Sequence, residues 1–464
     1  MFIKNRSSLL SLSRNEIEHK IVPLLFDLIE ESLDIAQPCN LMSEYILFNN
    51  LEMIIKEEKI DLSEFNKYHM LAFGKASQTM SKWLLDNFPL YFSRIILVSP
   101  NECDDHFESL PDFSFFKAGH PTPNNESLEA AEYTLNFLRN LSSDDLCFVL
   151  ISGGGSSLFE SPSFDVSLED YQTLIGLLLF SGASIHEINT IRKHFSKVKG
   201  GKLALQTKAR IIALIMSDVI GNDPSIIASG PTAPDVSTWN DCKDILTKYN
   251  LQTQLPKSIT FNIENGLSNN IEDTPADHSL FSHVSNFIIG DNSLLLSKLK
   301  DKISNNYCVK ILTHSLTGES SERGKELAIT SIKHFTDEKS SSKSHYYFLL
   351  FSGETTVTLK TPAGLGGRNQ ELALSFALEI MNNYPIYLAS FGTDGIDGTS
   401  LAAGALIGPF TISDDVKKQK ANVALSTHDS NSFFKEYGGE IITNHTGTNL
   451  LDIGIICMKF DKEK

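Results

Sequence analysis

From residue 68 onward, short apolar runs alternate with longer amphipathic stretches. The runs are rich in Val, Ile, Leu and Phe and end in Gly, Ser, Pro or Asp. Such runs are typical of strands buried on both faces of a parallel sheet. The stretches between them, such as residues 126–140 and 168–181, have helical length and period. Alternating strands and helices predict an α/β fold. The first four runs are residues 70–74, 94–100, 147–155 and 211–218.

One interruption of this pattern divides the chain. Residues 251–285 are polar, poorly periodic and rich in Asn and Ser, so they are the predicted connection between two domains. The α/β pattern restarts at residues 286–292. Residues 16–60 carry helical spacing of apolar positions and predict two helices. We therefore expect an N-terminal segment and two domains, each a Rossmann-like, mostly parallel sheet flanked by helices. The predicted limits are residues 1–22, 23–260 and 280–464.

Length and charge narrow the classes of function. At 464 residues the chain is too long for one ordinary hydrophobic core. The net charge of -17 argues against nucleic acid or an anionic membrane as the main partner. No apolar stretch reaches the ~18 residues that cross a bilayer. The six cysteines form no C-x-x-C pair, which indicates reduced thiols in an intracellular protein rather than a zinc site or a disulfide framework.

The N-terminal sequence MFIKNRSSLLSLSR is basic and Ser-rich, and it lacks the apolar centre of a secretory signal. Two interpretations stay open. A frayed terminus of a cytoplasmic protein is the favoured one, and a mitochondrial presequence is the alternative. The sequence does not determine the oligomeric state, and a homodimer is one of the alternatives.

The glycine-rich segment after the predicted strand 147–151 is a candidate anion-binding loop. In an open parallel sheet, ligands bind beyond the carboxyl ends of the strands. Bare glycines with flanking hydroxyl groups suit phosphate or carboxylate, although an ordinary tight turn explains them equally well. Leu158 stands where a Rossmann fingerprint requires its third glycine. The residues of this loop are Ser152, Gly153, Gly154, Gly155 and Ser156.

Charged residues follow two other predicted strands. Lys75, at a strand-to-helix turn, is placed to reach a phosphate near the helix N-terminus, or it is simply solvated. Asp218 and Asp223 suit magnesium or a substrate hydroxyl, and capping of the next turn is the alternative for Asp218. Residues 318–325 have one residue too many between their glycines for a Walker A loop. Any use of ATP therefore proceeds without a P-loop.

Arg368 directly follows the glycine-rich sequence GLGG. An arginine there offers a planar fork of donors to carboxylate or phosphoryl oxygens. Glu354 follows the preceding predicted strand, and Asp394 and Asp397 follow the next one. One basic group among several carboxylates favours a functional site over ordinary turns.

In their order along the chain, these segments resemble the MOFRL-containing glycerate kinases, the class that forms 2-phosphoglycerate. The resemblance runs from residue 74 to about residue 449. It implies two α/β domains with the active cleft between them. It also implies Mg²⁺-ATP-dependent transfer of the γ-phosphoryl group to the C2 hydroxyl of D-glycerate. The matching segments are GKAS, AGHPTPN, LISGGGSS, INTIRKHFSKVKGGKLA, MSDVIGNDPSIIASGPT, HSLTGE, SGETTVTL, GLGGRNQELAL, FGTDGIDG and TGTN.

The resemblance assigns the family's functional lysine to Lys75 and its functional arginine to Arg368. Both fit phosphoryl transfer, in which charge spreads over the transferring oxygens. We expect the glycerate carboxylate to bind residues 152–156, Asn189 and Arg192.

The expected metal is Mg²⁺, held by Asp218, Asp223 or Asp394, one of which accepts the hydroxyl proton. Glu354 and Asn369 are further candidates for contact with substrate or nucleotide.

Two departures from the family pattern concern this metal shell. Asn222 stands where the family usually has an acid, and Leu401 replaces another. Two other functions therefore stay open. An NAD(P)H-dependent hydroxypyruvate reductase is one, although the missing third glycine argues against dinucleotide binding. A non-catalytic nucleotide-binding relative is the other, and the two lost acids support it.

Overall fold

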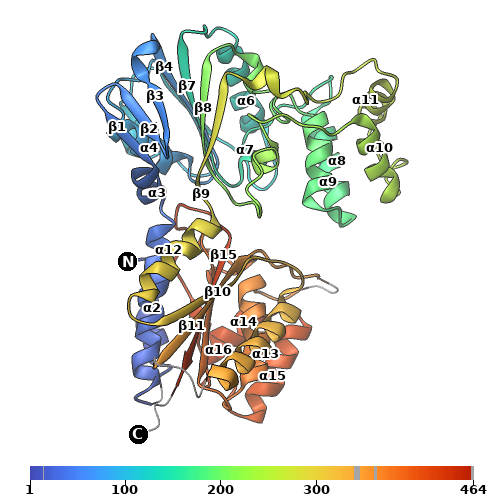
Figure 1. Ribbon diagram of the computed structural model, residues 1–464. Helices are drawn as coiled ribbons and strands as arrows, with labels where there is room; N and C mark the ends of the chain where they lie inside the picture. Colours follow the sequence, from blue (N-terminus) through green and yellow to red (C-terminus); the bar gives the residue numbers. More distant parts are fainter. Residues whose placement is uncertain (14, 339–344, 360–362, 461–464) are drawn as a thin grey trace. The chain divides into compact units, whose positions relative to one another are not determined.

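Two six-stranded sheets, each covered by helices, organise the chain and confirm the α/β class (Figure 1). The computed structural model describes residues 1–13, 15–338, 345–359 and 363–460. One sheet belongs to Leu41–Ile289, here called the central unit. The other belongs to Met1–Asn40 and Gly290–Lys464, here called the terminal unit.

The sheet of the central unit has the order β6-β5-β4-β7-β8-β9, and the four strand pairs from β6 to β8 are parallel. The four predicted strands are confirmed as β4, β5, β7 and β8. Phe73 of β4 lies beside Ile151 of β7, so the loops that follow these two strands are neighbours. The strands are β4 (Lys67–Phe73), β5 (Arg94–Ser99), β6 (Phe113–Lys117), β7 (Asp145–Ile151), β8 (Arg210–Met216) and β9 (Val284–Gly290).

Helices cover both faces of this sheet. One face packs on α6 through a core that includes Leu71, Val149 and Ala213. On the other face Phe148 contacts Phe88, which directly follows α4. Helices α8 to α11 form a helical lobe with its own core, beside the sheet in Figure 1. The helices are α4 (Ser77–Asn87), α5 (Asp105–Glu108), α6 (Asn125–Leu138), α7 (Gly155–Leu158), α8 (Leu168–Phe180), α9 (Ile185–His194), α10 (Trp239–Lys248) and α11 (Lys257–Leu267).

The start of the central unit differs from the prediction of two helices over residues 16–60. Helix α3 (Pro38–Tyr45) ends early, and an antiparallel sheet of β1, β2 and β3 follows. Apolar residues alternate with exposed ones in these strands, and Asn50 and Lys56 adopt positive φ in the turns. This is the period of a strand, not of a helix. The strands are β1 (Ile46–Asn49), β2 (Glu52–Ile55) and β3 (Glu58–Asp61).

The predicted connection over residues 251–285 is also different in the structure. It contains α11, and β9, expected to open the second domain, instead completes the central sheet. The chain enters the terminal unit only at Gly290. Residues 251–285 are polar partly because α11 is buried on one side only. Ile259 and Ile263 of this helix face the lobe core.

The sheet of the terminal unit is mixed, in the order β10-β11-β15-β12-β13-β14. The pair β10–β11 is parallel, but β15 runs antiparallel to both β11 and β12. The strand directions thus differ from the mostly parallel sheet expected here. The last strand of the chain inserts between two earlier ones, and β13 is antiparallel to both of its neighbours, β12 and β14. The strands are β10 (Cys308–Leu316), β11 (Tyr346–Gly353), β12 (Ile386–Gly392), β13 (Gly404–Ile407), β14 (Glu440–Ile441) and β15 (Asp452–Lys459).

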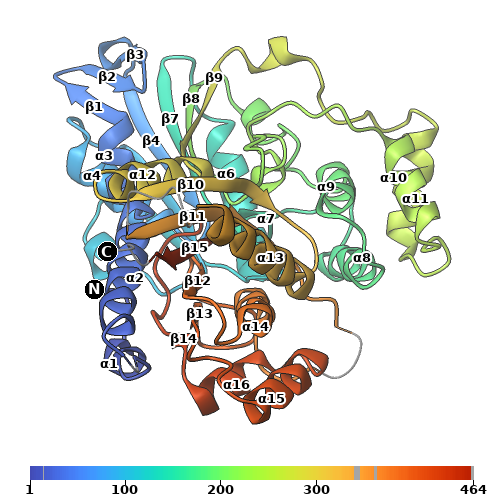
Figure 2. The same ribbon diagram turned by 60° about the horizontal axis from the view of Figure 1, so that its bottom comes forward.

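Helices α2 and α12 lie on one side of this sheet, and α13 to α16 on the other (Figure 2). Residues 23–35 of α2, expected in the first domain, belong to the terminal unit because the buried apolar face of α2 packs on α12 and β15. The helices are α1 (Arg6–Leu10), α2 (Glu18–Ile35), α12 (Asn292–Ser304), α13 (Ser320–Glu338), α14 (Arg368–Ile380), α15 (Asp415–Ser426) and α16 (Ser430–Tyr437).

The first residues of the chain are held in place rather than frayed. The backbone N–H groups of Phe2 and Ile3 donate to the Glu30 carboxylate at 2.7 and 2.8 Å. Asn5 donates to the backbone oxygen of Glu440 at 2.7 Å. None of the helices in the described part of the chain combines the length and the hydrophobicity that a bilayer crossing needs.

Candidate functional site

The loops after β4 and β7 are joined by hydrogen bonds that backbone N–H groups of the first loop donate to the second. Lys75 N donates to Gly153 O at 2.8 Å, and Ala76 N donates to Ser152 Oγ at 3.0 Å. A Cβ atom on Gly74, whose φ is +125°, would lie 2.2 Å from Ser152 Oγ. Only glycine fits this contact, so Gly74 is needed for the two loops to meet.

Two more side chains lie close to Gly154 of this loop. A Cβ atom there would lie 3.4 Å from Lys75 Cγ and 3.0 Å from His120 Cδ2. Lys75 and His120 therefore flank the glycine loop. His120, which lies in the AGHPTPN segment, was not among the predicted site residues.

A chain of hydrogen bonds runs from the glycine loop to the helical lobe. Ser156 Oγ lies 3.0 Å from Ser229 Oγ, and Ser229 Oγ donates to Asn189 Oδ1 at 3.0 Å. Asn189 Nδ2 is 3.4 Å from Ile226 O. The structure thus brings Asn189 to Ser156 through Ser229, a residue that the sequence analysis did not select. Ser229 lies in the ASGPT part of the matching segment MSDVIGNDPSIIASGPT. In the structure Ala228, Ser229 and Gly230 all adopt positive φ.

Ser156 and Arg192 line one small cavity of about 80 Å³, here called the Arg192 cavity. Gln172 Nε2 donates to Pro123 O at 2.6 Å, which ties α8 to the Pro121–Pro123 segment across the cavity. One water needs about 10–15 Å³ by the same measure, so this cavity suits a ligand of a few non-hydrogen atoms. Its lining consists of Pro121, Thr122, Pro123, Ser156, Ser157, Tyr171, Gln172, Ile175, Gly176, Leu179 and Arg192.

A buried ionic network supports the wall of this cavity. Lys199 Nζ lies 2.6 Å from Glu160 Oε2, and these side chains are 1% and 0% exposed. Tyr171 Oη and Ser196 Oγ also donate to Glu160. Burial lowers the pKa of Lys199, and the Glu160 carboxylate opposes that shift. Glu160 therefore links α8, through Tyr171, to the turn that follows α9.

The loop after β8 carries the two aspartates predicted to hold metal. Asp218 is half-buried, whereas Asp223 is exposed, and its Oδ1 accepts from Ser225 N at 2.8 Å. Asp223 therefore already caps a turn, an alternative that the sequence raised for Asp218.

In the terminal unit, Arg368 is the first residue of α14 and is held by two carboxylates. Its Nε and Nη2 donate to Asp452 at 2.6 and 3.0 Å, and Nη1 donates to Glu354 at 2.6 Å. Burial alone would lower the pKa of Arg368, but Asp452 and Glu354 raise it well above its usual value. The guanidinium group is thus permanently charged and fixed in orientation.

Asp452 was missed by the sequence analysis. It begins β15 and pairs in register with Gly353 of β11 and Gly392 of β12. In a parallel sheet, an acid at the start of a strand lies at the edge opposite the ligand-binding loops. Because β15 is antiparallel, Asp452 lies instead at the edge where β11 and β12 end.

Asp394 lies at the same edge. A Cβ atom on Gly392 would lie 3.2 Å from Asp394 Oδ1 and 3.4 Å from Asp452 Oδ1. Within the described residues, however, no group of three or more His, Cys, Asp or Glu side chains is arranged to hold a metal ion. Asp218 and Asp223 belong to the central unit and Asp394 to the terminal unit.

An internal carboxylate occupies the N-terminus of α14. The N–H groups of Asn369 and Gln370 donate to Asp397 at 2.9 and 2.8 Å. Burial raises the pKa of Asp397 to about 7, although these N–H donors oppose the shift. Asn369 itself is 2% exposed, and its Oδ1 accepts from Ser390 at 2.7 Å. Its role in binding substrate or nucleotide stays a prediction, whereas its role in packing is direct.

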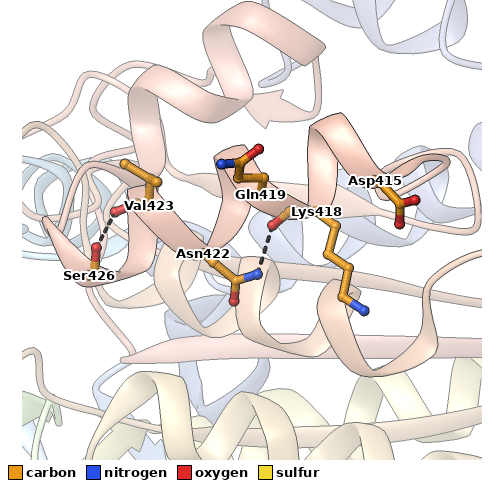
Figure 3. Close-up of a pocket in the computed structure, with 6 residues that line it drawn as sticks. All are labelled: Asp415, Lys418, Gln419, Asn422, Val423 and Ser426. Carbon is orange, nitrogen blue, oxygen red and sulfur yellow. Dashed lines mark hydrogen bonds between the residues drawn. The ribbon is translucent and has the colours of Figure 1, made fainter.

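Beside this helix start, Gly366, Gly367 and Arg368 line a hollow of about 350 Å³ with Thr355 and Thr399. A hollow of this size is in the range of sites for larger small molecules. A second surface hollow, on α15, is lined by that helix alone, as Figure 3 shows. There Asn422 donates to Lys418 O and Ser426 to Val423 O, so these bonds stay within the helix. Side chains from one helix face do not enclose a ligand, and the α15 hollow is not a candidate site.

Comparisons with known proteins cover the parts of the chain that carry both loop clusters. A family model described as "Domain of unknown function (DUF4147)" matches residues 24–264, and the model of the MOFRL family matches residues 347–452. A protein of Pyrococcus horikoshii named glycerate 2-kinase is 35% identical over 92% of this chain and 95% of its own length. A protein of Agrobacterium vitis named putative hydroxypyruvate reductase is 36% identical over 73% of this chain and 76% of its own.

A crystal structure of glycerate kinase from Thermotoga maritima is similar throughout. It is 33% identical, with a TM-score of 0.79, and the match covers 94% of this chain and 99% of that one. Both family models, the near-complete coverage and the shared fold lead to one assignment: the chain belongs to the MOFRL-containing glycerate kinase family.

Proposed function

We propose that this protein is an ATP-dependent glycerate 2-kinase, which transfers the γ-phosphoryl group to the C2 hydroxyl of D-glycerate. One observation carries the proposal. The glycine loop after β7 lies against Lys75 at Gly154 and lines the Arg192 cavity with Ser156. One loop therefore presents a cation suited to a phosphate and a cavity suited to a small carboxylic acid.

The Arg192 cavity is the proposed site of glycerate. A guanidinium group and a hydroxyl group are strong donors to a carboxylate, and charge-assisted hydrogen bonds are about twice as strong as neutral ones. Asn189 acts through Ser229, which orients the Ser156 hydroxyl. The small volume supports a three-carbon acid rather than a nucleotide in this cavity.

Lys75 and Arg368 are the proposed stabilisers of the transferring phosphoryl group. Phosphoryl transfer needs positive charge placed in advance more than it needs covalent help. A guanidinium group has five N–H donors. Within the described residues three of them are engaged by Asp452 and Glu354, which leaves one N–H on each Nη for a ligand.

Magnesium is part of the proposal, with Asp218, Asp223 and Asp394 as its candidate ligands. Mg²⁺ is usually held by one or two carboxylates together with substrate phosphates, so a cluster of three acids is not required. The oxygen donors of these residues fit such an ion. When bound, the ion neutralises charge on the phosphate oxygens.

The proposal is tested by ADP release that depends on glycerate. Purified protein with ATP and Mg²⁺ should release ADP on addition of D-glycerate, and excess EDTA should stop the release. An Arg192→Ala variant should show a raised KM for glycerate and an unchanged KM for ATP. ADP release that is independent of glycerate would reject the assignment.

Hydroxypyruvate reduction is the second candidate, because a relative bears that name. The glycine loop argues against it, since Leu158 replaces the third glycine of a dinucleotide fingerprint. Loss of NADH absorbance with hydroxypyruvate, and no ADP release with glycerate, would favour the reductase.

A further inference from the structure

Gly176 lies in the interior of α8, where neither backbone nor packing requires a glycine. It is absent from the residues with positive φ, and a Cβ atom added there would meet no atom within 4 Å. Gly266 in α11 is different, because its Cβ would lie 2.2 Å from the ring of Trp239. Glycine inside a helix is less stable than alanine. The local structure thus gives no stability reason for glycine at position 176.

The surroundings of Gly176 suggest a functional reason. Gly176 lines the Arg192 cavity together with Ser156, Arg192 and its neighbour Ile175. The space beside Gly176 is open although it borders this cavity, so a side chain there would take up room next to the ligand. The cavity is only about 80 Å³, so even one methyl group occupies a substantial share of it.

We propose that Gly176 is a specificity-determining residue, which leaves room for the hydroxymethyl end of the acceptor acid while Arg192 and Ser156 bind its carboxylate. This inference rests on the proposed function. The small cavity limits the acceptor to a small 2-hydroxy acid. Helix α8 forms the wall that excludes longer acids. The bond from Gln172 to Pro123 holds this wall in place, so the helix does not yield to a longer substrate.

A graded series of variants tests the proposal. Gly176→Ala should raise the melting temperature and raise the KM for D-glycerate about tenfold, since one methylene in a close-fitting pocket is worth roughly 10–200-fold in selectivity. Gly176→Leu should raise that KM further. The KM for ATP should not change. The ratio of kcat/KM for glycerate to that for glycolate, which lacks the hydroxymethyl group, should decrease along the series.

Thr173→Leu is the matched control. Thr173 is exposed on the same helix and is not part of the cavity lining, so added bulk there should leave both KM values unchanged. Calorimetric titration with D-glycerate supplies a measurement that does not need turnover. If Gly176→Leu is unstable, Gly176→Ala carries the test.

The outcomes separate this inference from the proposed function. If the wild type phosphorylates glycerate but Gly176→Leu binds it as tightly as the wild type, the inference is wrong and the function stands. If the wild type binds glycerate without phosphorylating it, and Gly176→Leu binds it more weakly, the kinase assignment fails and the role of Gly176 stands. A parallel rise in the KM for ATP would also overturn the inference.

Discussion

Arg368 and Asp452 form a two-pronged ion pair, with Nε 2.6 Å from Oδ2 and Nη2 3.0 Å from Oδ1. Asp452 is 6% exposed. A bidentate pair fixes the plane of the guanidinium group as well as its position. We infer that Asp452 positions Arg368 and leaves its remaining N–H groups directed for a ligand.

Asp452→Asn should lower kcat by roughly 10²-fold, because a catalytic group displaced by about 1 Å costs that much. The KM for glycerate should change little, since Arg368 is not assigned to its carboxylate. Steady-state kinetics give both values, and a thermal melt shows whether the variant is folded. Asp301→Asn, an exposed residue of α12, is the control. An Asp452→Asn variant with a normal kcat would contradict the positioning role.

Lys75→Ala should reduce turnover by orders of magnitude while the fold survives, because its charge is assigned to the phosphoryl group. Lys82→Ala, which removes an exposed lysine from the neighbouring helix α4, should leave turnover unchanged. Circular dichroism checks the fold of both variants. Near-normal activity of Lys75→Ala would remove Lys75 from the site.

The parallel part of the fold was largely predictable because β4, β5, β7 and β8 are apolar runs that end at a glycine or a polar residue. Residues 46–61 were misassigned, because strands this short offer only about two alternations each. The position of β15 was not predictable, because strand order depends on contacts across the chain. Because the place of β15 in the sheet was not predicted, Asp452 was not predicted as a site residue either.

The predicted site residues of the central unit, in contrast to Asp452, could be selected from the sequence. Lys75, Ser156, Asn189 and Arg192 came from loops that follow neighbouring strands or from the adjoining lobe, and the structure brings them to one region. Gly176 could not be selected from the sequence, because the helical period of residues 168–181 says nothing about the space beside one glycine. Its open surroundings appear only in three dimensions.

Asp397 should make the stability of the protein depend on pH. Burial raises the pKa of Asp397 to about 7, whereas an unfolded aspartate titrates near 3.9. From about pH 4 to about pH 7 the folded chain therefore binds more protons than the unfolded one, and stability decreases as the pH rises. Melting curves should show a steeper loss for the wild type than for Asp397→Asn. Parallel curves would show that Asp397 does not titrate in this window.

Lys199→Met should destabilise the protein by about 3–5 kcal/mol, because it leaves the Glu160 carboxylate buried without its cation. Adding Glu160→Gln to this variant should recover much of the loss. Lys197→Met is a matched control: Lys197 pairs with Glu132 at the same 2.6 Å, but these side chains are 43% and 37% exposed. Its cost should be about 0–1 kcal/mol. Urea unfolding gives all three values, and equal costs for Lys199→Met and Lys197→Met would contradict the importance of burial.

The most direct test of the central claim is the identity of the product formed from D-glycerate and ATP. Proton-coupled ³¹P NMR distinguishes the two positions, because C2 carries one hydrogen atom and C3 carries two. Transfer to the C2 hydroxyl predicts a phosphomonoester doublet that grows with ADP. A triplet, which indicates transfer to the C3 hydroxyl, or no phosphomonoester at all, would contradict the assignment as a glycerate 2-kinase.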